Sequence, residues 1–249
     1  MNGSNLLNAS PSDPRQDRGG APDGGRTIWK FAGLTLVLLV GSCLAAWADE
    51  FSQESRYSVR LFSVGSLSID TRVGDIDISG WDEPRVEIDA EKVVRARNRT
   101  SAQPLFDQIK VVLEGQDKLV QLRTSYPSRR LWRPFRDESK LSVNFSIKMP
   151  YDAALNLVCV DGDVRISGIV GREQLRVNYG DVEVDLPSVW TLRSFNARTW
   201  LGYVESDLHG TEQDGAGLHQ KVNFWNPSGK QDVAVRVRMG GVFVYSNAQ

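Results

Sequence analysis

The chain is poor in the residues that most catalytic and metal sites use. It has two cysteines (Cys43 and Cys159) and two histidines (His209 and His219) among 249 residues. Two cysteines provide no disulfide framework, and no Cys-x-x-Cys or Cys/His spacing indicates a metal site. Neither histidine accompanies a nucleophile motif such as Gly-x-Ser-x-Gly, so we interpret both as ordinary loop residues. We therefore predict no catalytic residue, no cofactor and no metal ligand, and we expect that the protein is not an enzyme.

The chain also lacks an excess of charge of either sign. It has 30 Lys and Arg residues against 31 Asp and Glu residues. Nucleic-acid-binding domains usually carry a basic face, so we predict no nucleic-acid partner. Cys159 lies in the apolar run Leu155–Val160, where we expect a buried thiol that behaves as a small apolar residue.

Long apolar runs are scarce, and Phe31–Ala48 is the clearest, with eighteen residues and no charge. Residues 1–30 are polar and rich in glycine, which predicts a disordered tail. Basic residues precede the apolar run, and Asp49 and Glu50 follow it. This charge order places the N-terminus in the cytoplasm and residues 49–249 outside it.

Three fates of the apolar segment remain open. Eighteen apolar residues are just enough for a transmembrane helix that anchors the chain in the bacterial cytoplasmic membrane. Ala46-Trp47-Ala48 fits a signal-peptide cleavage site, after which the rest of the chain would be exported. Val40-Gly41-Ser42-Cys43 loosely fits a lipoprotein box. Each alternative places the C-terminal region outside the cytoplasm.

A short phrase recurs along the rest of the chain: a glycine followed by alternating apolar and polar residues. Clear copies begin at Gly74, Gly162 and Gly180, and weaker copies begin at Gly202 and Gly240. From Gly162 the steps are 18, 22 and 38 residues, which approximates a period of about 20 residues. Alternation predicts short strands with one buried face. We therefore predict an all-β fold, a coiled β-solenoid or β-helix-like stack of repeats in which the copies are clearest over residues 151–249.

Longer strands are predicted before these repeats, because residues there alternate or are β-branched. Two polar interruptions, Arg95–Pro104 and Tyr126–Lys140, are interpreted as loops, and we expect at most one helical turn at Val93–Arg99. Residues 49–249 are interpreted as one continuous β domain. The expected strands are Ser58–Phe62, Leu67–Thr71, Arg85–Val94, Gln108–Glu114, Leu119–Thr124 and Leu141–Met149.

Stacked repeats bring equivalent positions together. We expect Val164, Val182 and Val204 to form one buried column and Ile166 to lie over Val184. On the outside, Arg165 should form an ion pair with Glu183. Three acidic positions should also align: Asp75, Asp163 and Asp181, with Asp185 and Asp207 as a second pair.

The aligned aspartates allow two interpretations. In one, each aspartate caps its own turn through a backbone amide. In the other, close carboxylates bind Ca²⁺ or share a raised pKa, as in an acidic ledge of a polysaccharide-active enzyme.

These phrases carry a family resemblance. The glycine repeats, Gly80-Trp81-Asp82, and the alternating Val143–Pro150 segment resemble the bacterial "putative adhesin" domain family. That resemblance covers about Val59–Ser246 and implies a β-helix-like, exported or membrane-anchored protein whose function is unknown. The family motifs are structural, and they carry no catalytic residue.

One exposed stretch is the candidate contact site. Four arginines alternate with two aromatic residues between positions 129 and 136, a pattern that suits anionic polymers, lipid headgroups or an envelope protein. In the alternative, the aromatic residues pack on the β core and the arginines remain in water. The candidate residues are Arg129, Arg130, Trp132, Arg133, Phe135 and Arg136.

The sequence therefore favours a non-enzymatic, adhesin-like structural or binding module of the bacterial cell envelope. Two alternatives remain open: a regulatory membrane protein that senses the state of the envelope, and a β-helix enzyme that acts on polysaccharides.

Overall fold

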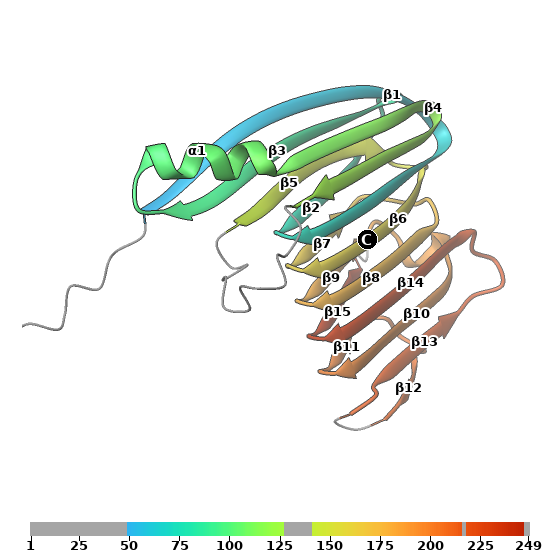
Figure 1. Cartoon of the computed structure of the whole chain (residues 1–249). Coiled ribbons are helices and arrows are strands. Elements are labelled where there is room, and N and C mark those ends of the chain that lie inside the picture. Colours follow the sequence, from blue (N-terminus) through green and yellow to red (C-terminus); the bar gives the residue numbers. More distant parts are fainter. Residues whose placement is uncertain (1–48, 127–140, 216–217, 247–249) are drawn as a thin grey trace, which may run out of the picture. The chain divides into compact units, whose positions relative to one another are not determined.

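The computed structural model describes residues 49–126, 141–215 and 218–246, and most of them form strands. The all-β prediction is therefore confirmed. One α-helix and one short 3₁₀ turn (Val189–Thr191) accompany the strands among the described residues (Figure 1). The strands are β1 (Asp49–Val73), β2 (Ile76–Trp81), β3 (Arg85–Ala96), β4 (Lys110–Ser125), β5 (Leu141–Pro150), β6 (Ala154–Asp161), β7 (Val164–Ser167), β8 (Glu173–Tyr179), β9 (Val182–Leu186), β10 (Leu192–Leu201), β11 (Val204–Ser206), β12 (Glu212–Asp214), β13 (Lys221–Trp225), β14 (Gln231–Met239) and β15 (Val242–Ser246).

The strands belong to one fifteen-stranded sheet that has free ends at β11 and β12. Its two halves contain two rows of parallel strands. Row A has the order β2, β7, β9, β15, β11, and row B has the order β1, β6, β8, β14, β10. Figure 1 shows the row B strands following one another down the molecule, with β13 and β12 after them. Because β1 pairs with β3 and then with β6, it joins the two halves.

The core lies between the two rows, because alternate residues of each strand point inward. Val164 lies beside Val182 and Ile166 beside Val184, and all four side chains are at most 2% exposed. These predicted contacts are confirmed. The facing residues of row B are also apolar and buried, among them Leu155, Leu157, Leu175, Val177, Val233 and Val235.

The order of the last strands differs from the prediction. Val204 does not lie beside Val182, because β15 inserts between β9 and β11 and places Val242 between these two valines. Row B shows the same insertion, with β14 between β8 and β10. The last repeat of the sequence is therefore the next-to-last layer of the stack, and the intervening chain forms the hairpin of β12 and β13.

A column of glycines permits this close stacking. The φ angle of Gly180 is 128°, and a Cβ atom at this position would lie 2.2 Å from the carbonyl oxygen of Gly162. A Cβ at Gly240 would lie 2.0 Å from the oxygen of Gly180. A side chain is thus excluded by both backbone conformation and space.

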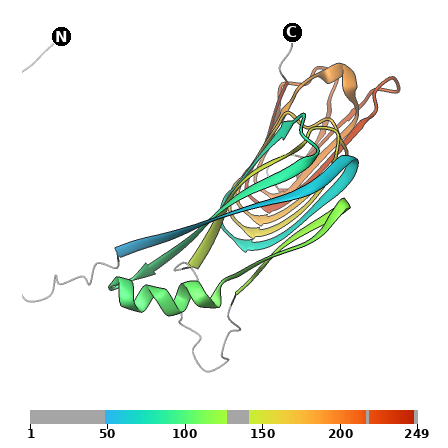
Figure 2. The same cartoon turned by 90° about the horizontal axis from the view of Figure 1, so that it is seen from above.

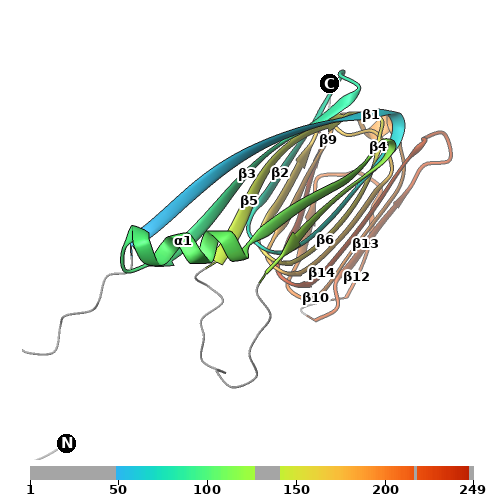
Figure 3. The same cartoon turned by 45° about the horizontal axis from the view of Figure 1, so that its top comes forward.

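The N-terminal strands are longer than predicted. β1 runs unbroken over both of the segments expected between Ser58 and Thr71, with an irregularity between Leu61 and Ser66. The predicted loop Arg95–Pro104 is also wrong in part, because α1 (Arg99–Gln108) begins there. The Asn98 side chain accepts a hydrogen bond from the amide of Ser101 and so caps the helix. Figures 2 and 3 show α1 beside the ends of β1 and β3, away from the stacked strands.

The predicted tail and apolar segment, residues 1–48, lie outside the described residues. Within the described ranges, no helix has both the length and the apolar character that a membrane span requires.

Candidate functional site

The predicted contact site, Arg129–Arg136, lies outside the described residues, and its role stays a prediction. The described residues present two further surfaces with opposite charge. They are the outer faces of row A and row B.

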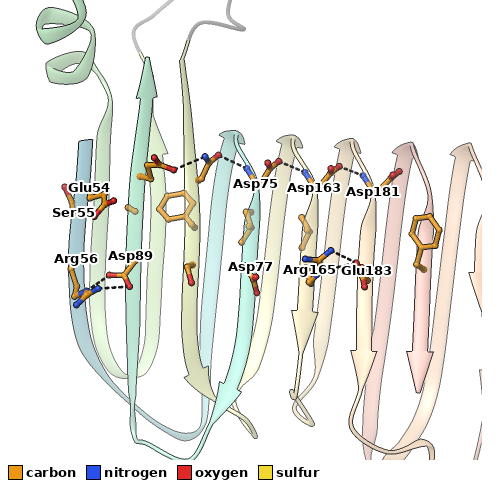
Figure 4. A pocket seen from close by; sticks show the side chains of 18 residues that line it. Glu54, Ser55, Arg56, Asp75, Asp77, Asp89, Asp163, Arg165, Asp181 and Glu183 are labelled. Carbon is orange, nitrogen blue, oxygen red and sulfur yellow. Dashed lines mark hydrogen bonds and ion pairs between the residues drawn. The ribbon is translucent and has the colours of Figure 1, made fainter. Parts of the chain in front are cut away.

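The outer face of row A carries a ladder of hydrogen bonds between aspartates (Figure 4). The carboxylate of Asp75 accepts a bond from the amide of Asp163 at 3.0 Å, and that of Asp163 accepts one from the amide of Asp181 at 2.9 Å. Asn144 begins the ladder by accepting from the amide of Asp75. Gly241 ends it by donating to the carboxylate of Asp181.

The predicted alignment of these three aspartates is confirmed, but the predicted capping is wrong. Each carboxylate caps the turn of the next layer rather than its own turn. The reason is geometric: adjacent strands lie about 4.8 Å apart, which brings the neighbouring amide within reach of a short side chain. The ladder thus links successive layers of row A.

The rest of this acidic face is partly neutralised. Arg165 forms the predicted ion pair with Glu183, with a nitrogen–oxygen distance of 2.9 Å. Arg56 forms an ion pair with Asp89. This pair lies in the same row of cross-strand neighbours as Arg165 and Glu183. The surrounding hollow has a volume of about 1160 Å³ and is lined by eight carboxylates and two arginines. Among the described residues, no group of three or more His, Cys, Asp or Glu side chains is arranged to hold a metal ion.

The second predicted acidic pair is wrong. Asp185 lies beside Tyr245 of β15, which separates it from Asp207. Asp207 instead accepts two hydrogen bonds from the amide of Ser246, at 2.9 and 3.0 Å. This error follows from the same inserted strand.

The outer face of row B carries an uninterrupted line of cations. Arg176 lies directly beside Arg236, Arg236 beside Arg198, and Arg198 beside Lys221. All four are exposed on neighbouring strands, β8, β14, β10 and β13. With Arg238 they line a hollow of about 820 Å³ that contains no carboxylate. We call this hollow the basic groove.

Among the described residues, the cations of the basic groove form no ion pair. Within the described part of the chain, no carboxylate lies at ion-pair distance from Arg176, Arg198, Arg236, Arg238 or Lys221. Nearby Asp232 is already paired with Arg193, which lowers the pKa of its carboxyl group. Asp214 of β12 lies beside Lys221 at one end of the line. Among the described residues, no carboxylate lies beside any of the three arginines Arg176, Arg236 and Arg198 on a neighbouring strand.

An aromatic residue lies at one side of the basic groove. Trp200 is 59% exposed, and its ring meets that of His219 edge to face, with 4.0 Å between ring centroids. The φ angle of His219 is 63°, a left-handed conformation in a loop. The backbone amide of His219 donates to the carbonyl of Trp200. His219 is thus a loop residue, as predicted, and it supports one edge of the Trp200 ring.

Amide side chains form a parallel line next to the cations. Gln174 lies beside Asn156 on one side and Ala234 on the other, and the line continues through Asn196 to Asn223. The amide of Asn196 donates a hydrogen bond to Asn223. The surface therefore combines fixed positive charge, an aromatic face and neutral hydrogen-bonding groups.

The basic groove was not predicted from the sequence, although a signal was present. Arg176, Arg198 and Arg236 each stand four residues before a repeat glycine, at Gly180, Gly202 and Gly240. These three arginines therefore occupy equivalent positions of the repeat, which a comparison of the residue four before each glycine would reveal. Lys221 has no such signal, because β13 is antiparallel to β10 and lies outside the repeat.

Two titratable groups are buried between the rows. Cys159 is 1% exposed, as predicted for a thiol that behaves as a small apolar residue, and burial raises its pKa to about 12. Glu173 is also 1% exposed, and burial raises its pKa to about 8. The amide of Gln231 donates to one Glu173 oxygen at 2.9 Å. Both groups lie inside the fold rather than on a binding surface.

No protein-family model and no curated protein matches the chain. Solved structures do match. One is described as a "putative cell adhesion protein" from Clostridium sporogenes, with 14% identity and a TM-score of 0.49, and the match covers 79% of this chain and all of that one. Another is a "putative adhesin" from Bacteroides fragilis, with 10% identity, a TM-score of 0.24 and coverage of 79% and 97%.

A "putative adhesin" from Parabacteroides distasonis has 12% identity and a TM-score of 0.25, with coverage of 80% of this chain and 98% of that one. The resemblance to "putative adhesin" proteins, expected from the repeated phrases, is confirmed by these comparisons. At these identities and TM-scores, no ligand or activity passes from those proteins to this chain.

Proposed function

We propose that this protein is a non-enzymatic binding module of the bacterial cell envelope that holds an anionic polymer in the basic groove. We further propose that its two rows form a β-solenoid outside the cytoplasm, either anchored through residues 31–48 or released by cleavage near Ala48. The parallel pairing of equivalent repeat positions supports the solenoid. The charge order around the apolar run supports the location.

The line of cations, which form no ion pair with any residue that the structure describes, carries this proposal. Like charges directly opposite one another on neighbouring strands destabilise a sheet, and the basic groove places four cations in such a line. An anionic polymer would remove that repulsion by neutralising several cations at once. Guanidinium groups stay protonated at any physiological pH, so they suit binding better than proton transfer.

Binding of the purified full-length chain to anionic polymers tests the proposal. The panel is polygalacturonate, poly(glycerol phosphate) and polyphosphate, with neutral dextran as the uncharged control, measured by isothermal titration calorimetry. We expect binding to at least one anionic polymer, none to dextran, and weaker binding as salt screens the cations.

A pair of variants with equal net charge locates the site. The groove variant carries Arg176→Gln, Arg198→Gln and Arg236→Gln. The control carries Arg56→Gln, Arg85→Gln and Arg165→Gln, which removes the same charge from strands on the acidic side. We expect at least a tenfold loss of affinity in the groove variant and less than a twofold loss in the control. Equal losses, or no binding by the wild type, would refute the proposed function.

A further inference from the structure

We infer that the polymer is a carboxylated polysaccharide with one acid group on each sugar, lying across the strands along the line of cations. This inference rests on the proposed function, because it specifies the ligand of the same groove. Three features support it: the spacing of the cations in the groove, the exposed tryptophan at its side, and a line of amides on the same face next to the cations.

The cations repeat at the distance between strands. Arg176, Arg236, Arg198 and Lys221 occupy four successive strands, so neighbouring positions are about 4.8 Å apart and the line spans about 14 Å. That step is comparable to the length of one sugar unit in an extended chain. A polymer with an acid on each sugar can therefore pair with each cation in turn. One with an acid on alternate sugars leaves every second cation unpaired.

Trp200 provides a flat apolar surface for a sugar ring. It is 59% exposed, and its edge contact with His219 holds the ring at the side of the groove. Pyranose rings present an apolar face of C–H groups, which aromatic rings bind in preference to water. Polyphosphate has no such face, so Trp200 distinguishes a charged sugar from a charged inorganic chain.

The line of amides suits the hydroxyl groups of the same ligand. Gln174, Asn196 and Asn223 each lie two residues along their strand from a cation, at the next outward-facing position. Asn156 of β6 extends this line beyond Gln174, and Ala234 of β14 interrupts it. Amide side chains both donate and accept hydrogen bonds, as sugar hydroxyls require. The cations also line a hollow, which suits a single chain better than a lipid surface.

Oligogalacturonates of one to eight units test the match between ligand and groove, by calorimetry with the full-length chain. Because four cations form the line, affinity should rise steeply up to four units and change less than threefold from four to eight. Hyaluronate oligomers, with an acid on alternate sugars, should bind at least tenfold more weakly than oligogalacturonates of equal length.

Trp200→Ala should weaken binding of the galacturonate tetramer at least fivefold and change binding of polyphosphate less than twofold. Trp190→Ala is the matched control, since Trp190 is 81% exposed and lies outside the groove, and it should bind as the wild type does. The inference would be overturned if affinity depended only on the total charge of the polymer, or if Trp200→Ala bound the galacturonate tetramer as tightly as the wild type. Either result would leave the proposed binding of anionic polymers in place. Binding to phosphatidylglycerol vesicles without binding to oligogalacturonates would also overturn it. If no anionic polymer binds, the proposed function itself fails.

Discussion

Arg236 illustrates how side chains on the two outer faces differ. It lies between Arg176 and Arg198, with no carboxylate partner among the described residues. On the acidic face, Arg165 lies beside Glu183 and forms an ion pair with it. Both arginines are exposed on strands, so the local structure is equivalent and only the neighbouring charges differ. Under the proposed function, this position contributes to ligand binding at the expense of stability.

Arg236→Thr should therefore stabilise the free protein while weakening polymer binding. Removing the central charge relieves two like-charge contacts, and threonine favours strands, so we expect a gain of about 0.5 kcal/mol. Urea denaturation of the variant and wild type measures this gain. Arg165→Thr is the control and should lose stability slightly because it breaks an ion pair. A loss of stability in Arg236→Thr would mean that the line of cations has no unfavourable energy for a ligand to relieve.

Glu173 makes stability depend on pH. Its pKa is raised from its usual value near 4.5 to about 8 because the carboxyl group is fully buried. The folded state therefore keeps a proton that the unfolded state releases, and stability should fall as pH rises from about 4.5 to about 8. The expected loss is on the order of 4 kcal/mol.

Glu173→Gln removes this titration and keeps a neutral side chain of similar shape. Its free energy of unfolding, measured in urea at several pH values between 4.5 and 9, should change much less with pH than that of the wild type. Parallel curves for the two proteins would show that Glu173 does not titrate in this range.

At the scale of the strands, two features hold neighbouring strands of row A, the successive layers of the stack, together. The glycine column lets the turns approach closely, and the aspartate ladder connects their backbones. Both devices lie at the same position of each repeat, directly before the first buried residue of β2, β7 and β9. The repeated Gly-Asp pair therefore has a structural role in stacking the layers.

Gly180→Ala should destabilise the fold by about 3 kcal/mol or more. The new Cβ would meet the carbonyl oxygen of Gly162 at 2.2 Å, in addition to the strain of a positive φ angle. Gly210→Ala is the control, because its φ angle is also positive, at 82°, but nothing lies within 4 Å of the added Cβ. It should lose only about 1 kcal/mol. Thermal unfolding compares the two, and equal losses would contradict the close contact between layers.

Two substitutions of Asp163 separate its hydrogen bond from its charge. Asp163→Ala leaves the amide of Asp181 without its partner and should cost about 1 kcal/mol. Asp163→Asn keeps an acceptor and relieves repulsion between neighbouring carboxylates, so it should be neutral or slightly stabilising. Chemical denaturation measures both. A larger loss in Asp163→Asn than in Asp163→Ala would contradict the ladder as a hydrogen-bonding device.

Across the whole molecule, alternation in the sequence predicted which residues face inward but not the order of the layers. The pairing of Val164 with Val182 could be predicted because β7 and β9 are consecutive repeats. The position of Val204 could not, because any of these short strands can pair with any other. In the structure β15 lies between β9 and β11, and the chain that links β11 to β14 forms β12 and β13.

The other differences also have local causes. Helix α1 has only two buried residues, Ala102 and Phe106, so it leaves little apolar periodicity in the sequence. The cap at Asn98 was its one clear signal. The basic groove escaped prediction because its arginines are far apart along the chain and meet only when the layers stack. The line of cations also forms only because β14 lies between β8 and β10, and this strand order was not predicted.

The most direct test of the account is a measurement of which tryptophans respond to a bound polymer. In a ¹H–¹⁵N spectrum, each indole N–H gives its own signal, and substitution assigns the signals of Trp200 and Trp81. Trp200 lines the basic groove, whereas the indole of Trp81 donates to the carbonyl of Arg85 in another part of the sheet. Adding polygalacturonate should shift the Trp200 signal and leave that of Trp81 unchanged. A shift of Trp81 with Trp200 unmoved would contradict the claim that row B is the binding face.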